Sequence, residues 1–275
     1  MENIRYYDNN LSIICDKYKN EEFISNEIFR PVIVREKHGK IDFGMENNFY
    51  NCNEKYYSDC ILEEDMVGLN DNTKLYKEKV EDIMYKLFLE REKAAADKIL
   101  DFYAYPENHR IDGSGLEDFI MWNDYGNSDP SSDIKKGHNI IRYSTGLNAN
   151  TIIISKNIFN LLKLNKKFND YKNIFKSRNM TEEDVIASFF DVDQILIGDA
   201  SIWGNSVILC YIAAEPNLKN SSFCYNFIWK KNNKNIFIAN KYGDISRRCI
   251  VIDVVSFYDQ KIICNGAGYL LLNVI

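Results

Sequence analysis

Three aspartates that lie close together in the sequence are the strongest candidates for chemistry. Asp191 and Asp193 precede the apolar run I-L-I, and Asp199 follows it. Carboxylates gathered in this way could hold a divalent cation and serve a metal-dependent enzyme. Asp is equally a residue of turns and helix ends, and its placement on both sides of a predicted strand favours that interpretation. A cytoplasmic α/β metal-dependent enzyme is kept as the alternative from another functional class.

Other side chains that could bind a ligand are scattered. His138 lies on the apolar face of a predicted helix, where a hydrogen-bonded core histidine is favoured over a ligand. The basic pairs Lys230-Lys231 and Arg247-Arg248 are short, so we interpret them as solvated or as part of a subunit contact. Trp122 and Trp203 adjoin turn residues and are expected to anchor loops to the core.

The seven cysteines form no C-x-x-C pair, and their number is odd. With three scattered histidines they give no zinc-ligand spacing. We expect buried free thiols in a reducing cytoplasm. The cysteines are Cys15, Cys52, Cys60, Cys210, Cys224, Cys249 and Cys264.

The sequence lacks the motifs of nucleotide-binding proteins and serine hydrolases. Neither G-x-x-x-x-G-K nor G-x-S-x-G occurs, and Gly113-Ser114-Gly115 lacks the third glycine of a dinucleotide-binding loop. No set of acid, base and nucleophile emerges. The prediction is a protein that is not an enzyme, with no catalytic, cofactor-binding or metal-binding residues and no cofactor.

Composition gives further limits. The chain has 275 residues, 45% of them hydrophobic, which is enough for one large or two intertwined domains. The net charge of −6 argues against tight binding of nucleic acid, which depends on Lys and Arg neutralising phosphates. The first ten residues lack a signal-peptide pattern, and no apolar run approaches the ~18 residues of a membrane span. We expect a soluble protein, made in the cytoplasm, with no membrane partner.

Hydrophobic spacing predicts one long helix after an extended region. Two short runs of alternating polar and apolar residues around Gly39 indicate a hairpin. The chain up to Gly68 is expected to continue this extended region and to contribute few residues to a hydrophobic core. From Tyr76 to Ile99 apolar residues, with Arg91 among them, recur every three or four positions, and neither Pro nor Gly interrupts them. A helix over 72–101 would be roughly 40 Å long.

The second half alternates capped helices with strands. A helix over 130–145 is predicted from Asp129-Pro130 at its start and Gly146 at its end. The pattern then predicts a buried strand at 151–154, a helix at 156–164 capped by Ser155, a helix capped by Thr181, and strands at 194–198 and 206–213. Strand-like runs dominate from Cys224 onward.

Three motifs stand in fixed order within this half. They are W-N-D-Y-G-N-S-D-P from Trp122, N-T-I-I-I-S from Asn150, and F-D-V-D-Q-I-L-I-G-D-A from Phe190. Their order and spacing resemble the signatures of the HK97-like major capsid proteins of tailed bacteriophages and gene transfer agents. The resemblance covers the chain from about Leu11 to Ile275.

The resemblance implies an α+β, HK97-like fold with four parts. These would be an N-terminal arm over 1–30, an extended loop over 31–68, a peripheral domain over 69–147 and 225–275 with the spine helix 72–101, and an axial domain over 148–224.

The resemblance also implies a structural protein of the virion that self-assembles into homo-pentamers and homo-hexamers of an icosahedral shell. The implied partners are other copies of the chain, a separate scaffolding protein, a portal protein, a decoration protein and double-stranded DNA contacted without sequence preference. Assembly would take place in the cytoplasm of the bacterial host. An encapsulin-like nanocompartment shell is the alternative within the same fold.

Overall fold

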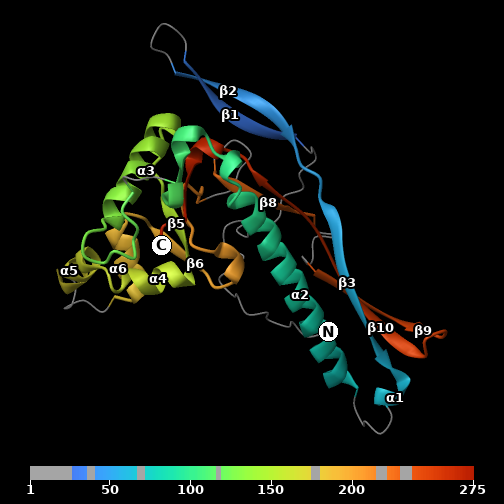
Figure 1. Ribbon diagram of the computed structural model, residues 1–275. Helices are drawn as coiled ribbons and strands as arrows, with labels where there is room; N and C mark the ends of the chain where they lie inside the picture. The colour runs from blue at the N-terminus through green and yellow to red at the C-terminus, as the bar shows by residue number, and fades with distance from the viewer. Residues whose placement is uncertain are drawn as a thin grey trace.

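The described residues form two larger sheets that are each packed against helices, a separate two-stranded hairpin, and one long helix that contacts both larger sheets (Figure 1). The computed structural model describes residues 27–35, 41–66, 72–115, 119–174, 180–214, 222–229 and 237–275. Cys15, Gly39 and the pair Lys230-Lys231 lie outside these residues.

The first sheet is antiparallel and has the order β3-β10-β8, with β9 also paired to β10. The central strand β10 pairs with β3 from Asn53↔Tyr258 to Leu62↔Cys249. Helix α2 packs on one face of this sheet, where Ile83, Met84 and Leu87 meet sheet residues in a shared core. The strands are β3 (Asn53–Leu62), β8 (Cys224–Ile228), β9 (Phe237–Asp244) and β10 (Cys249–Ile262), and the helices of this part are α1 (Glu63–Met66) and α2 (Thr73–Ile99).

The second sheet has five strands in the order β4-β11-β7-β5-β6. It is mixed, since β4 pairs with β11 and β6 with β5 in parallel, and the other neighbours are antiparallel. Both faces are covered, so β5 is buried at every position. The strands are β4 (Arg110–Asp112), β5 (Thr151–Ser155), β6 (Gln194–Gly198), β7 (Val207–Cys210) and β11 (Gly268–Leu272).

Residues of this sheet alternate between two cores, as the period-2 geometry of a strand requires. Ile152 and Ile154 face the core that four helices within residues 130–189 complete, and Ile153 faces the opposite core. Ala96 and Ile99, at the end of α2, belong to this opposite core. Helix α2 therefore connects the two sheets through packing at both of its ends.

Three of the helices beside the five-stranded sheet begin at the caps that the sequence predicted, Asp129, Ser155 and Thr181. The Asp129 carboxylate accepts from the Ser132 N–H at 3.2 Å, and Gly146 ends the helix in the left-handed region at φ 73. Thr181 and Asp184 form a reciprocal capping box, with bonds of 3.1 and 3.2 Å. The helices are α3 (Pro130–Thr145), α4 (Lys156–Leu162), α5 (Lys166–Ile174) and α6 (Glu182–Phe189).

Several element predictions need correction. The helix expected at 156–164 ends at Leu162, because the chain turns there and a second helix, α5, follows that the sequence did not predict. The strand expected over 206–213 is limited to the residues that pair with β5 and β11, Val207–Cys210. The helix predicted over 72–101 is observed over Thr73–Ile99, and the Asn72 side chain makes no hydrogen bond that caps its start.

The predicted hairpin is present as β1 (Glu27–Arg35) and β2 (Ile41–Phe49), paired antiparallel along nine residues each. It extends beyond the edge of both sheets (Figure 1). The segment up to Gly68 was expected to contribute little to a hydrophobic core. This expectation was wrong for Ile61 of β3, which is 1% exposed and packs against α2. Short 3-10 turns complete the fold at Phe102–Ala104, Glu107–His109, Gly113–Gly115, Ser201–Trp203 and Asn265–Ala267.

The five-stranded sheet extends beyond residues 148–224, the range expected for the axial domain. Its strands β5, β6 and β7 lie inside that segment, and β4 and β11 lie outside it. Among the helices that the structure describes, none is long and apolar enough to cross a membrane.

Candidate assembly surfaces

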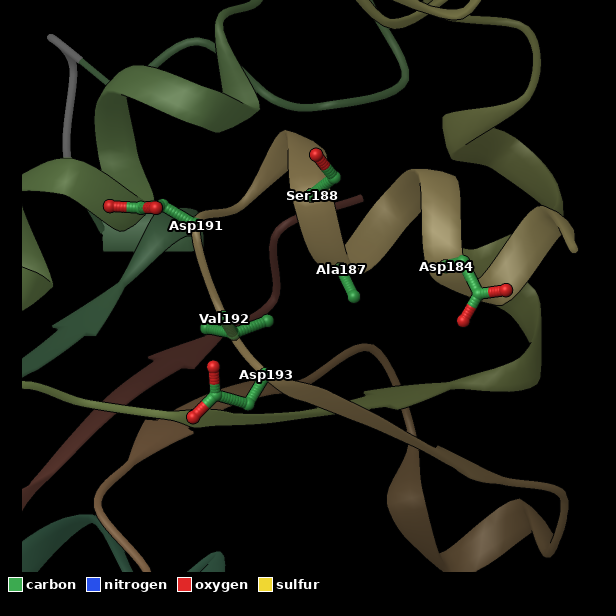
Figure 2. A pocket seen from close by; sticks show the side chains of 6 residues that line it. All are labelled: Asp184, Ala187, Ser188, Asp191, Val192 and Asp193. Atoms are coloured by element: carbon green, nitrogen blue, oxygen red, sulfur yellow. The ribbon is translucent and has the colours of Figure 1, made fainter. Parts of the chain in front are cut away.

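The acidic residues near α6 occupy a cap and turns. Asp191 follows α6 with a left-handed φ of 56, and Asp199 is exposed just beyond the end of β6. A shallow pocket is lined by Asp184, Asp191 and Asp193, whose carboxylates point in different directions (Figure 2). The Asp184 carboxylate accepts the Thr181 N–H. Within the described ranges, no three His, Cys, Asp or Glu side chains gather in a way that could hold a metal ion.

The two described histidines each bond to a backbone carbonyl. The half-buried His138 lies 2.9 Å from the carbonyl oxygen of Phe190, to which its Nε2–H can donate, as expected for a core histidine. His109, which the sequence did not single out, is 1% exposed and lies with Nδ1 2.8 Å from the carbonyl oxygen of Gly268. Burial lowers the pKa of His109 below its ordinary value.

Both predicted tryptophan anchors are buried, each at 2% exposure. The Trp122 indole donates to Asp133 on α3 at 3.1 Å, and the Trp203 indole donates to Glu92 on α2 at 2.8 Å. Trp122 thus joins a loop to the helix that follows it, and Trp203 joins a turn to a helix 111 residues away in the sequence. The prediction that they anchor loops to the core is confirmed.

Six cysteines are described, and all are free thiols. Cys210, Cys224, Cys249 and Cys264 are buried as expected, whereas Cys52 and Cys60 are only partly buried, so the expectation was wrong for these two. Burial raises the pKa of the half-buried Cys52 to about 11, with a smaller contribution from the nearby Asp259, so this thiol stays protonated at neutral pH.

Two polar contacts join α2 to the first sheet through Lys79 and Arg91. Lys79 on α2 bonds to Asp59 on β3 at 2.9 Å, which lowers the pKa of Asp59 and raises that of Lys79. Arg91 is 5% exposed and lies over the Tyr258 ring at 5.8 Å. Its position on the apolar face of the helix pattern already indicated burial, although the ring contact could not be read from the sequence.

Several large apolar side chains of the described residues are exposed, including residues of α2 and of the turn between β9 and β10. On α2, Tyr85 is 65% exposed and Leu89 is 42% exposed. In the turn between β9 and β10, Ile245 is 94% exposed beside the predicted basic pair Arg247-Arg248. A contiguous apolar patch is typical of a surface that another molecule covers, whereas single exposed apolar side chains are common on any protein.

Comparison with known proteins gives one curated relative and many solved structures. The chain is 24% identical over 248 residues to the major capsid protein of a Burkholderia phage, which covers 78% of this chain and 79% of that protein. No protein-family profile matches the chain.

Among solved structures, a phage-related protein from Bordetella bronchiseptica has a TM-score of 0.71 at 18% identity, covering 91% of this chain and 88% of that one. A virus-like particle from Pyrococcus furiosus has a TM-score of 0.55 at 13% identity, covering 90% of this chain and 86% of that one. The fold is HK97-like, and the resemblance to phage coat proteins that the sequence motifs indicated is confirmed.

Proposed function

We propose that this chain is the major coat subunit of a DNA-containing particle, a tailed phage or a gene transfer agent, and that it self-assembles into an icosahedral shell of pentamers and hexamers. The observation that carries the proposal is likeness to a phage major capsid protein in sequence, together with an HK97-like fold along most of the chain. The role is structural rather than catalytic.

The parts of the chain would divide this work. The segment 1–30 serves as an arm, and the region 31–68 acts between subunits through its hairpin, with β3 within it remaining in the subunit's own sheet. The segments 69–147 and 225–275 form the peripheral domain with its spine helix, and 148–224 forms the axial domain at the ring centre. Cyclic rings need a head-to-tail contact between two different surfaces.

The other partners would be a scaffolding protein, a portal protein and a decoration protein. Double-stranded DNA would be contacted without sequence preference. The net charge of −6 suits an inner shell surface that binds DNA only weakly. Assembly would take place in the cytoplasm of a bacterial host.

Negative-stain microscopy and light scattering of the purified protein at micromolar concentration test the proposal. Closed shells, tubes or rings far above the 32.2 kDa monomer are expected. A protein that stays monomeric at every salt concentration, with and without a scaffolding protein, would refute it.

The encapsulin-like nanocompartment shell, the alternative within the same fold, is the second candidate, and a virus-like particle from Pyrococcus furiosus has a similar fold. Nucleic acid that survives nuclease treatment of particles isolated from the native source favours the DNA container. A co-purifying enzyme in stoichiometric amounts favours the nanocompartment.

A further inference from the structure

Two of the free thiols are neighbours on the first sheet. Strand β3 pairs with β10 so that Cys60 is opposite Val251, and Leu62 is opposite Cys249. Cys60 and Cys249 are therefore diagonal neighbours on adjacent strands, the kind of cross-strand pair whose side chains can meet. The two thiols share a hydrogen bond, which places their sulfur atoms in direct contact.

Both thiols lie on the face of this sheet opposite α2. Side chains alternate between the two faces along a strand, and Ile61, which follows Cys60, packs against α2. The residue paired with Ile61 is Ile250, which follows Cys249. Cys60 and Cys249 therefore point to the same side of the sheet, as a bond between them requires.

The two thiols differ in their access to solvent. Cys249 is 3% exposed, and burial raises the pKa of its thiol, with further contributions from Cys60 and Asp244. Cys60 is partly exposed, and Ser58 and Leu62, its neighbours on the same face of β3, are exposed. A dissolved reagent therefore reaches Cys60 before it reaches Cys249.

The pair lies where the strands can adjust. Cys249 is the first residue of β10, and Cys60 comes just before the end of β3 at Leu62. A disulfide joins Cα atoms about 4.4–6.8 Å apart, whereas diagonal neighbours in a sheet are typically about 7–8 Å apart. Bond formation therefore needs a small shift of one strand, and at the end of a strand such a shift disturbs few hydrogen bonds of the sheet.

We propose that Cys60 and Cys249 form a reversible redox pair, which a small-molecule disulfide such as oxidised glutathione converts from two thiols to an intramolecular disulfide. The Cys60 thiolate attacks one sulfur of the oxidant, whose S–S bond breaks and releases one thiolate. The Cys249 thiolate then attacks the Cys60 sulfur of this mixed disulfide and releases the second thiolate. The protein loses two electrons and two protons, and the oxidant becomes two thiols.

The disulfide would fasten β10 to β3, the strand that follows the β1–β2 hairpin. It would join two residues that are far apart in the sequence, and a cross-link of this kind stabilises a protein mainly by restricting the unfolded chain. The oxidised protein should therefore unfold at a higher temperature than the reduced protein. The inference is independent of the proposed coat function, because both thiols belong to one subunit.

Oxidation of the purified full-length protein with oxidised glutathione tests the pair. After alkylation of the remaining thiols, peptide mass mapping should show the Cys60 peptide joined to the Cys249 peptide, and dithiothreitol should separate them. We expect the melting temperature to rise by at least about 4 °C on oxidation and to return to its original value on reduction.

Variants test the order of the two steps. In Cys249→Ala the glutathione adduct should remain on Cys60, because no second thiol displaces it, and in Cys60→Ser the buried Cys249 should take up no glutathione. Cys52→Ser is the matched control, since Cys52 is also partly buried but donates to the Phe227 carbonyl at 3.4 Å. It should form the disulfide as the unmodified protein does, and so should Cys15→Ser.

The unmodified protein alone can refute the proposal, so the outcome does not depend on the folding of any variant. A disulfide between other cysteines, a glutathione adduct that persists on Cys60, or two unreacted thiols would each overturn the redox pair. A disulfide that leaves the melting temperature unchanged would contradict the expected fastening of β10 to β3. None of these results bears on assembly, so the coat function would stand.

Discussion

Trp203 donates its indole N–H to a carboxylate oxygen of Glu92 across 2.8 Å, although 111 residues separate the two in sequence. The bond joins helix α2 to the turn that follows β6. The Trp203 ring also lies directly against Gly198, where an added Cβ would come within 2.3 Å of ring carbon. The position of α2 relative to the five-stranded sheet therefore depends on a glycine that leaves room for this ring.

We predict that Gly198→Ala destabilises the subunit by about 1–3 kcal/mol, because neither the strand nor the buried ring can move away cheaply. Thermal or urea unfolding measures the change. Gly243→Ala on β9 is the matched control, since an added Cβ there meets nothing within 4 Å, and a change of about 0.5 kcal/mol or less is expected. Equal effects of the two substitutions would contradict the packing argument.

Proline in the middle of α2 should prevent assembly. Lys86 is exposed within Thr73–Ile99, so Lys86→Pro removes no packing but breaks a backbone hydrogen bond, at about 3 kcal/mol or more. We expect insoluble or unassembled protein by sedimentation, and near-normal behaviour for Lys86→Ala. Shells of Lys86→Pro in ordinary yield would rule out α2 as a continuous supporting helix.

Helix starts and one strand could be predicted from the sequence, because they depend on residues that are close together in the chain. Asp129, Ser155 and Thr181 cap their helices through bonds to backbone N–H groups three residues ahead, a spacing visible in the sequence. The strand at 194–198 was likewise predicted with its observed bounds. The tryptophan anchors followed from large side chains beside turn residues.

Long-range pairing could not be predicted in this way. The placement of β11 between β4 and β7 joins segments more than fifty residues apart, and no residue of β11 signals its partners. Helix α5, K-K-F-N-D-Y-K-N-I, has few apolar residues, and it is Phe168 packing into the core that makes it part of the fold. The position of the basic pair at 247 and 248 beside α1 also depends on the β3–β10 register, so the sequence could indicate this pair only as a possible contact.

His109 should make stability sensitive to mild acid. Burial lowers its pKa in the folded protein below the ordinary value of about 6.5, so the unfolded chain binds a proton more readily. Stability is therefore intact above about pH 6.5 and is lost as the pH falls through the folded pKa. We predict a shallower decline between pH 7 and pH 5 for His109→Asn, measured by urea unfolding.

Measurements at pH 8 provide the control for this substitution, because His109 is neutral there in both states and any difference reports lost packing alone. His109→Asn can keep an N–H donor for the Gly268 carbonyl. A pH dependence identical to that of the unmodified protein would show that His109 is not the group responsible.

The β1–β2 hairpin should be needed for shells and not for folding of the subunit. Replacing residues 27–49 with a short Gly-Ser linker removes a pair of strands that belongs to neither sheet, and an isolated two-stranded hairpin is marginally stable in water. The variant should melt cooperatively near the normal temperature and form no shells.

Extending the replacement through Leu62 should instead unfold the subunit, because it removes β3 and the buried Ile61. If the shorter replacement unfolded the protein, the hairpin would belong to the subunit core, and if it still gave closed shells, the hairpin would not be the element that joins neighbours.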